Sequence, residues 1–505
     1  MPTVDFTLRW ADGTEQRCQS PSTAIERYLT EGGRYPHHEL LRRTREGLNA
    51  ASQRVVEVFG MACTAAAAQI EAIERAARPG LVEVTRMRRA PTRVRFPAPD
   101  RLSGHHEVII VGGGQAGLAV SHCLMQRGVD HVVLERDRVL HNWRDARWDA
   151  FSLVTPNWQC ALPGHPYPGD DPDGFMVKDE ILAYVEPYAT GKPIYEGVTV
   201  HAIRPGFEVE TSHGTLTADQ VVLAVGGYHV PLIPDHGLPG IHSSRYRNPE
   251  SLPDGPVLVV GTGQSGAQIA EDLHLAGRTV HLAVGTAPRV ARFYRGRDCV
   301  AWLQDMGHYD LAVTDHPQGK ATRKEANHYV TGRAGGHDLD LRAFAAEGLY
   351  LHGRLTHVED GTLHFAGDLP ANLDAADATM ERIKDGIDRY ITANGIDAPE
   401  EPRYTPPWTP PTDGSGTLAA EAISTIVWAT GFRSDWSFVD VPGFDPDVHH
   451  RGVTEVPGLY VVGLPWLHTW GSGRFAGIAR DAEHLSDRVC ASPSRRPRSP
   501  QRQAA

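Results

Sequence analysis

Residues 108–117 read VIIVGGGQAG, four β-branched residues followed at once by glycines in the spacing G-x-G-x-x-G. The next segment, residues 116–126, has a helical pattern. This order of strand, glycine loop and helix is typical of a dinucleotide-binding domain. We expect Gly112 to make the turn, Gly114 to let the backbone approach a pyrophosphate, and Gly117 to let the helix pack on the strand. The pyrophosphate would then lie at the helix N-terminus, where free N–H groups favour negative charge.

The strand that follows this helix ends in a carboxylate. Residues 131–134 read HVVL, and Glu135 comes directly after them. In dinucleotide-binding folds an acidic residue about 20 positions beyond the glycine loop accepts hydrogen bonds from ribose hydroxyls. We therefore predict that this site binds the ADP half of FAD; the alternative is a glycine-rich turn without a ligand.

A second strand and glycine loop repeats the pattern at residues 257–266, VLVVGTGQSG. The position equivalent to Glu135 is here Val284, so a ribose 2′-hydroxyl has no acidic partner. Arg289 and Arg292 follow in the next loop, and a guanidinium can hold a 2′-phosphate. The motif predicts a site for NADPH rather than NADH; the alternative is that these arginines line a basic surface.

The length of 505 residues requires more than one hydrophobic core, because cores stop growing near ~250–300 residues. The predicted fold class is α/β, with two Rossmann-like dinucleotide-binding domains, one for FAD and one for NADPH, and a small N-terminal α+β domain. The expected boundaries are residues 1–90 for the small domain, 91–105 for a linker, 106–250 and 426–490 for the two parts of the FAD-binding domain, 251–425 for the NADPH-binding domain with insertions, and 491–505 for a disordered tail.

The N-terminal domain shows a complete small pattern of its own. Residues 3–10 and 14–18 flank a D-G turn and predict a β-hairpin. Helices are expected over residues 37–58 and 62–77, before a last strand at residues 81–87. No catalytic set of residues is evident in this part of the chain.

Composition excludes several classes of function. The formal charge of −12 argues against general binding of nucleic acid or anionic membranes. The six cysteines include no C-x-x-C pair, which removes both a paired-thiolate zinc site and the redox-active disulfide of flavin-dependent disulfide reductases. We expect no metal site. Neither an export signal nor an apolar run near the ~18 residues of a membrane span is evident, so we expect a cytoplasmic protein.

Several further segments resemble the flavin-containing monooxygenases. Residues 221–227 (VVLAVGG) and 426–432 (IVWATGF) are similar to the paired motifs that carry the chain between the FAD and NADPH domains in that family. Residues 457–463 (PGLYVVG) and 477–482 (GIARDA) resemble its closing FAD segment. Taken in order, these motifs extend the likeness from Glu107 to Val489.

The resemblance also implies which residues surround the flavin. Trp143-Arg144 and residues 155–158 (TPNW) look like the segments that meet the isoalloxazine ring, with Asn157, the expected catalytic residue, near the reactive flavin carbon. The full set of expected cofactor-binding residues is Gly112, Gly114, Gln115, Gly117, Glu135, Trp143, Arg144, Val200, Ala224, Gly226, Gly261, Gly263, Gln264, Ser265, Gly266, Arg289, Thr430, Gly431, Gly463 and Asp481. Trp470 is a candidate for the substrate side of the flavin and equally a candidate packing residue.

One family feature is only partly present. The fingerprint F-x-G-x-x-x-H-x-x-x-W/Y is echoed at residues 238–246 (LPGIHSSRY), where the spacing from glycine to histidine is two residues short. In detail the chain is more similar to bacterial flavin-dependent oxidoreductases encoded in nitrilase gene clusters, through residues 296–298 (GRD), Trp302 and residues 338–344 (DLDLRAF).

The N-terminal domain resembles a separate family from the same clusters, the nitrogen-starvation-response proteins. The likeness lies in residues 6–13 (FTLRWADG), 20–21 (SP) and 59–63 (FGMAC). The chain therefore resembles a fusion of two neighbouring proteins.

These resemblances imply a flavin monooxygenase. NADPH would reduce FAD, the reduced flavin would capture O2 as a C4a-(hydro)peroxide, and a small molecule would be oxygenated, with a nitrogen-containing substrate suggested by the likeness alone. A flavin reductase or oxidase is the first alternative, and a nucleotide-sensing regulator the second. The sequence leaves the oligomeric state open, a homo-oligomer included.

Overall fold

The computed structural model describes residues 3–59, 64–90, 96–235 and 238–492. The chain divides into two compact units, Met1–Arg95 with Asp179–Thr190, and Phe96–Lys178 with Gly191–Ala505. Cys63, part of the expected linker and nearly all of the expected tail lie outside the described residues. None of the helices within these ranges is long and apolar enough to cross a membrane.

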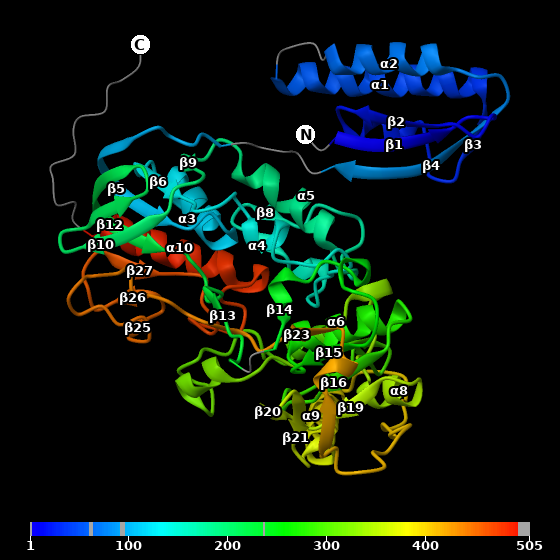
Figure 1. Ribbon diagram of the computed structural model, residues 1–505. Helices are drawn as coiled ribbons and strands as arrows, with labels where there is room; N and C mark the ends of the chain where they lie inside the picture. The colour runs from blue at the N-terminus through cyan, green and yellow to red at the C-terminus, as the bar shows by residue number, and fades with distance from the viewer. Residues whose placement is uncertain (1–2, 60–63, 91–95, 236–237, 493–505) are drawn as a thin grey trace. The chain divides into compact units, whose positions relative to one another are not determined.

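The N-terminal part is a four-stranded antiparallel sheet with two helices over one face (Figure 1). Its elements, in sheet order β2-β1-β4-β3 and then the helices, are β2 (Glu15–Ser20), β1 (Thr3–Arg9), β4 (Leu81–Ala90), β3 (Arg34–Pro36), α1 (His37–Phe59) and α2 (Thr64–Ala76). Alternate residues Val4, Phe6 and Leu8 of β1 are buried, as the two-residue period of a strand requires. The predicted hairpin, helices and last strand are confirmed, whereas β3 was not expected.

The first glycine motif belongs to a nine-stranded sheet, called here the β5 sheet. Its strands are β5 (Leu102–Val111), β6 (His131–Leu134), β9 (Ile194–Tyr195), β10 (Val200–Arg204), β11 (Glu208–Thr211), β12 (Gly214–Leu223), β25 (His449–His450), β26 (Val453–Thr454) and β27 (Leu459–Val461). β5 pairs in parallel with β6 and β12, and residues 108–111 of β5 are buried, as expected for a central strand.

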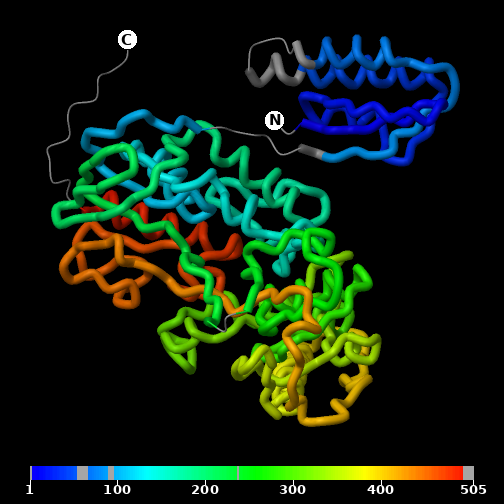
Figure 2. The backbone as a smooth tube through the Cα atoms, in the orientation of Figure 1, coloured from blue at the N-terminus to red at the C-terminus, as the bar shows by residue number. Residues whose placement is uncertain are grey.

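The C-terminal segment returns to complete this part of the fold. Helix α10 (Phe475–Ala491) packs against α3 (Gln115–Gln126), so the red end of the tube runs beside the cyan start of the β5 sheet (Figure 2). Residues separated by about 360 positions in sequence therefore meet beside the first glycine loop, as the hydrogen bond from Gln115 to Gly473 shows.

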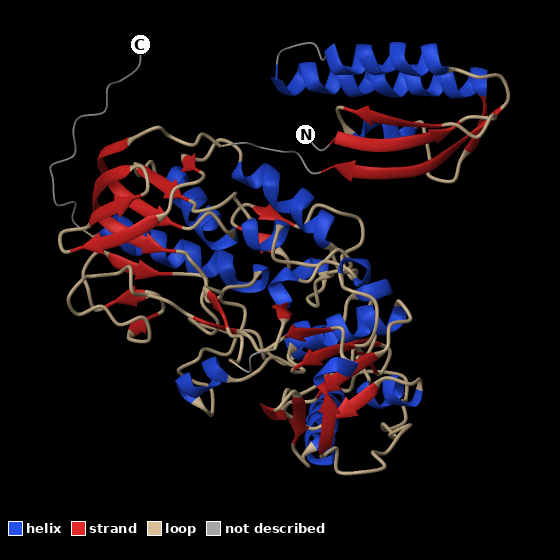
Figure 3. Ribbon diagram, in the orientation of Figure 1, coloured by secondary structure: helices blue, strands red, loops and turns tan. Residues whose placement is uncertain are grey.

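The second glycine motif lies in a five-stranded parallel sheet, the β15 sheet, of order β14-β23-β15-β16-β19 (Figure 3). Its strands are β14 (Gly240–His242), β15 (Val257–Val260), β16 (Val280–Ala283), β19 (Tyr350–His352) and β23 (Thr425–Trp428). Around it lie α6 (Gln264–Leu275), α7 (Cys299–Asp305), α8 (Leu341–Ala346), α9 (Leu369–Asn394) and an antiparallel sheet of β20 (Leu355–Glu359), β21 (Thr362–Phe365) and β22 (Gly416–Ala419).

Several short elements follow one another between strands of a single sheet: α4 (His141–Arg144), the hairpin of β7 (Ala161–Leu162) and β8 (His165–Pro166), and α5 (Lys178–Ala189) come between β6 and β9, and the hairpin of β17 (Phe293–Tyr294) and β18 (Arg297–Asp298) comes between β16 and β19. The pair β13 (Val230–Pro231) with β24 (Phe432–Arg433) lies where the chain passes between the two larger sheets. Because β13 and β24 follow β12 and β23, the two chain crossings between the sheets lie side by side. The α/β fold class with a small N-terminal domain is confirmed.

Candidate active site

A single cavity of about 980 Å³ reaches both glycine loops. The first loop contributes Gly112, Gly114 and Gln115, and the second contributes Gln264 and Ser265. All of its lining residues belong to the larger of the two units. Two dinucleotides bound at these loops would therefore extend into one common space.

The glycines of the first loop divide into those that pack and one that faces open space. A Cβ on Gly117 would lie 1.9 Å from the carbonyl oxygen of Gly112, so only glycine lets α3 approach β5 this closely. Gly112 itself has φ +111, a conformation that favours glycine. A Cβ on Gly114 would meet no atom within 4 Å. This empty side of Gly114 is where a pyrophosphate can approach the backbone.

The second loop has the same geometry. A Cβ on Gly266 would lie 2.0 Å from the carbonyl oxygen of Gly261, whereas a Cβ on Gly263 would meet nothing within 4 Å. Gly114 and Gly263 are the N-caps of α3 and α6, and neither supplies a side-chain cap. The first N–H groups of both helices are therefore available to an anion, which the helix dipole also favours.

Glu135 lies at the ribose end of the first site. Its carboxylate accepts hydrogen bonds from the backbone N–H groups of Gly113 (2.6 Å) and Asp137 (2.9 Å). Burial is the main influence on this group and raises its pKa, while the two N–H groups act in the opposite direction. The backbone thus fixes the carboxylate at the cavity wall, where it can also accept ribose hydroxyls.

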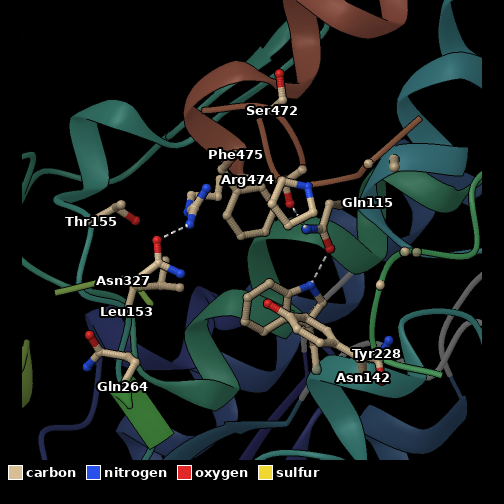
Figure 4. A pocket seen from close by; sticks show the side chains of 18 of the residues that line it. Gln115, Asn142, Leu153, Thr155, Tyr228, Gln264, Asn327, Ser472, Arg474 and Phe475 are labelled. Atoms are coloured by element: carbon tan, nitrogen blue, oxygen red, sulfur yellow. Dashed lines mark hydrogen bonds between the residues drawn. The ribbon is translucent and has the colours of Figure 1, made fainter. Parts of the chain in front are cut away.

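Aromatic side chains line the space between the loops. Trp143 stacks on Phe475 with ring centroids 5.5 Å apart, and its indole N–H donates to Gln115 Oε1 at 2.7 Å. The amide nitrogen of Gln115 donates in turn to the carbonyl of Gly473 at 3.1 Å (Figure 4). Gln264, at the equivalent position of the second loop, donates to the carbonyl of Val330. Each loop glutamine thereby braces a segment on the opposite side of the cavity.

About half of the expected cofactor residues line the cavity. These are Gly112, Gly114, Gln115, Glu135, Trp143, Val200, Ala224, Gly226, Gln264, Ser265 and Gly463. Trp470 also lines it, beneath the guanidinium of Arg474. The packing glycines of the two loops lie behind the cavity wall and shape it indirectly.

Three further expected residues act elsewhere. Thr430 and Gly431 lie at the chain crossing, where the Thr430 hydroxyl donates to Leu232 and the Gly431 carbonyl accepts from His242. Arg144 donates to the carbonyl of Val139 and is absent from the described cavity lining. In the described structure these residues make local contacts and are not among the cavity-lining residues.

Asp481 also departs from its expected role. It is 2% exposed and does not appear among the described cavity-lining residues. Burial, the largest influence, raises its pKa, and Ser472 and Arg451 interact with its carboxylate. Since Ser472 lines the cavity, Asp481 supports the wall from behind.

Asn157, the expected catalytic residue, is held by local hydrogen bonds. The side chain is 3% exposed, its Nδ2 donates to the carbonyl of Asp171 at 2.9 Å, and its Oδ1 accepts from the N–H of Met176 at 2.9 Å. Both ends of the amide are therefore used in holding the loop that follows. Leu153 and Thr155, a few residues earlier, face the cavity instead (Figure 4).

Arg289 is likewise committed to internal contacts. Its side chain is 3% exposed and lies 2.9 Å from Asp377 and 3.3 Å from Asp340, above the ring of Tyr404. Arg292 is 1% exposed and binds the carbonyl of Val154 and the carboxylate of Asp298. Arg289 is thus paired with two carboxylates and is not among the described residues that line the cavity.

The structure adds residues that the sequence did not single out. Asn142, Arg147, Tyr228, Asn327 and Arg474 all line the cavity. Arg474 directly precedes α10 and follows the Ser472-Gly473 turn, a signal that could have extended the closing FAD segment backwards. Asn327 lies in an irregular segment with no recognisable motif.

A potential metal-ligating group lies outside the cavity. Among the described residues, His357, Glu359 and His364 place one ligand atom each within 4.8 Å of one another on the β20–β21 hairpin. None of the three belongs to the cavity lining.

Comparison with known protein families separates the two parts of the chain. Residues 5–86 match the family described as nitrogen starvation-induced protein NitG. Residues 109–306 match the pyridine nucleotide-disulphide oxidoreductases, a region that contains both glycine loops. The predicted likeness of the N-terminal domain to nitrogen-starvation proteins is confirmed.

A solved structure shares the fold of the larger part. A variant of the flavin monooxygenase from Stenotrophomonas maltophilia aligns with a TM-score of 0.51 at 19% identity, over 77% of this chain and 99% of that chain. At this identity the likeness concerns the fold alone.

Two related proteins align with the same larger part of the chain. The indole-3-pyruvate monooxygenase YUCCA1 of Oryza sativa subsp. japonica is 28% identical over 74% of this chain and 90% of its own length. A CzcO-like oxidoreductase of Geobacillus kaustophilus is 30% identical over 399 residues, 75% of this chain and 97% of its own length. At this identity and coverage, the chain belongs to the family of CzcO-like oxidoreductases.

Proposed function

We propose that the protein is a FAD-dependent, NADPH-consuming monooxygenase that oxygenates a small molecule with O2. The observation that carries this proposal is the single cavity bordered by two uncapped glycine-loop helices. Two nucleotide sites that open into one space suit transfer of hydride between two cofactors. Similarity to a relative named as an indole-3-pyruvate monooxygenase supports the proposal that the substrate is oxygenated.

The residues present fit FAD at the first loop. The open side of Gly114, the free N–H groups of α3 and the carboxylate of Glu135 match pyrophosphate and ribose. FAD, when bound, supplies the exchange of two electrons and the reaction with oxygen. The second loop, with Gly263 and Ser265 at the start of α6, fits the pyrophosphate of NADPH.

The chain's own side chains then orient the reactants and exclude water. Gln115 and Gln264 hold opposite walls of the cavity to the two loops. Trp143 and Phe475 present apolar surface between them, which keeps water from a reactive centre. Arg474 and Asn327 are joined by a hydrogen bond of 2.7 Å and add polar donors at the same wall.

A reductase or oxidase without substrate oxygenation is the main alternative. Disulfide reduction is disfavoured, because no cysteine occurs among the described residues that line the cavity. A nucleotide-sensing role would not require a second loop that opens into the same space. We also propose that the protein is cytoplasmic and that it belongs to the oxidoreductases encoded in nitrilase gene clusters.

The test begins with the visible spectrum of the purified protein. NADPH added without oxygen should bleach the flavin band, and air should restore it through a long-lived species that absorbs in the near ultraviolet. Bleaching without that species would favour a reductase or oxidase. A colourless protein that cannot be reconstituted with FAD would refute the proposal.

A further inference from the structure

Beyond the two glycine loops, the cavity extends into a chamber formed by α7, the segment 306–330 and α9. Val300, Leu303, Met306 and Ile383 give this chamber apolar surface. The expected FAD-binding residues Gly114 and Glu135 line another part of the same cavity, whereas Gln264 of the second loop reaches Val330 at the border of the chamber. The chamber therefore adjoins the second loop and offers apolar surface to an organic substrate.

The charge of the chamber comes from Arg382. No carboxylate occurs among its described lining residues, and the guanidinium donates one hydrogen bond, to Thr379 Oγ1 at 3.2 Å. No ion pair of Arg382 is present within the described parts of the chain. Since a guanidinium has five N–H donors, most of its capacity is open to a ligand.

Two histidines of the chamber, His308 and His328, add no further positive charge. Burial, with smaller contributions from the charges of His308 and Arg382, lowers the pKa of His328 to about 4. Burial also lowers the pKa of His308. At neutral pH both rings are uncharged, so they can border an apolar ligand while Arg382 keeps the chamber positive.

A second arginine lies deeper in the cavity without an acidic partner among the described residues. Arg474 donates to the carbonyl of Trp470 and to Asn327 Oδ1, both neutral acceptors, and lies 4.1 Å above the indole of Trp470 (Figure 4). Burial lowers the pKa of its guanidinium. Arg474 is half-buried, and an anionic ligand would offset part of the cost of a cation that lacks an acidic partner among the described residues.

Building on the proposed function, we propose that the chamber selects an organic carboxylate with an apolar body. Arg382 pairs with the carboxylate, and Val300, Leu303 and Ile383 contact the apolar part. Arg474 already binds two neutral acceptors beside Gly473, so it contributes positive potential at the cofactor end. A protonated amine of the same size meets Arg382 and no carboxylate among the described residues that line the chamber, and binds less well.

Three probes of equal size test the charge preference: benzoate, benzamide and benzylammonium. Calorimetric titration of the FAD-loaded protein, without NADPH, should show benzoate binding at least about tenfold more tightly than benzamide, as expected for a charge-assisted pair. Benzylammonium should bind most weakly. Equal affinity for benzoate and benzamide would overturn the proposal.

Variants then assign the preference to Arg382. Arg382→Gln should lose about tenfold in benzoate affinity with no change for benzamide, and Arg382→Lys should retain part of it, since the charge remains but the planar fork does not. Arg389→Gln is the matched control, because Arg389 is exposed on α9 as Arg382 is, but is absent from the described cavity lining. An equal loss in the control would overturn the assignment.

A titration with NADP⁺ distinguishes a substrate site from a cofactor site. If Arg382→Gln weakens NADP⁺ rather than benzoate, the arginine serves a cofactor phosphate and the proposal fails. Failure of the proposed function has a different signature, because NADPH would then not bleach the flavin whether or not benzoate binds.

Discussion

Gly114 allows ligand binding to be tested apart from folding. Its backbone has φ −79° and ψ −178°, which alanine adopts without strain, and a Cβ there meets no atom within 4 Å. Gly114→Ala should therefore fold with little change in stability, because the gain of about 0.4–1 kcal/mol from a less flexible unfolded chain is offset by the poorer N-cap that alanine makes at α3. The added methyl group occupies the space that the FAD pyrophosphate needs to reach the N–H groups of α3.

The expected loss follows from the hydrogen bonds at stake. A hydrogen bond to a charged group contributes about 1.5–3 kcal/mol, so displacing the phosphates from one N–H weakens FAD binding roughly 10- to 150-fold. Gly117→Ala is the matched contrast. Its Cβ would lie 1.9 Å from the Gly112 carbonyl oxygen, and overpacking of this kind costs about 1–3 kcal/mol of stability.

The assay has two readouts. Thermal unfolding of the FAD-free proteins should separate Gly117→Ala, which is destabilised, from Gly114→Ala, which is not. Titration of FAD by fluorescence should show weakened binding in Gly114→Ala. Wild-type affinity for FAD in that variant would refute the assignment of this loop as the pyrophosphate site.

Three further predictions concern the second loop, a buried histidine and metals. Gly263→Ala should raise KM for NADPH about tenfold or more while FAD content stays constant, for the same reason as at Gly114, and an unchanged KM would contradict the second site. His328 has its pKa lowered from 6.5 to about 4, so its contribution to stability is present above pH 6.5 and is lost as pH falls towards 4. In urea unfolding between pH 7 and 4, the free energy of unfolding of His328→Gln should fall less than that of the wild type, by up to about 3 kcal/mol. Equal pH dependence of the two proteins would contradict this prediction. A chelator should leave NADPH oxidation unchanged, because the metal-ligating group among the described residues, His357, Glu359 and His364, lies outside the cavity lining; lost activity would show a metal requirement.

Local sequence patterns predicted the elements that depend on nearby residues. The hairpin around Gly13, the two glycine loops and Glu135 all follow from spacing within about 30 positions. Such features can be predicted from the sequence because the turn, strand and helix signals are adjacent in it. The two glycine loops and the position of Glu135 were therefore predictable from local spacing.

Residues whose role depends on distant partners were not predictable. Asn157 has the expected place in the chain, yet Asp171 and Met176 use its amide. Arg382 and Asn327 carry no motif, and they reach the cavity only because α9 and the segment before Val330 fold over it. A loop residue's neighbours are set by tertiary contacts, which a single sequence does not display.

The ion pairs of Arg289 change the physical basis on which NADPH is expected to be preferred over NADH. The position equivalent to Glu135 is Val284, which is 2% exposed, so a 2′-phosphate meets no acidic repulsion. The attraction expected from Arg289 is absent, since Asp340 and Asp377 neutralise it. An arginine that bound the phosphate would contribute about 1.5–3 kcal/mol, or roughly 10- to 150-fold in selectivity. We therefore expect kcat/KM for NADPH to exceed that for NADH by less than about tenfold, and a much larger ratio would require another cation to bind the phosphate.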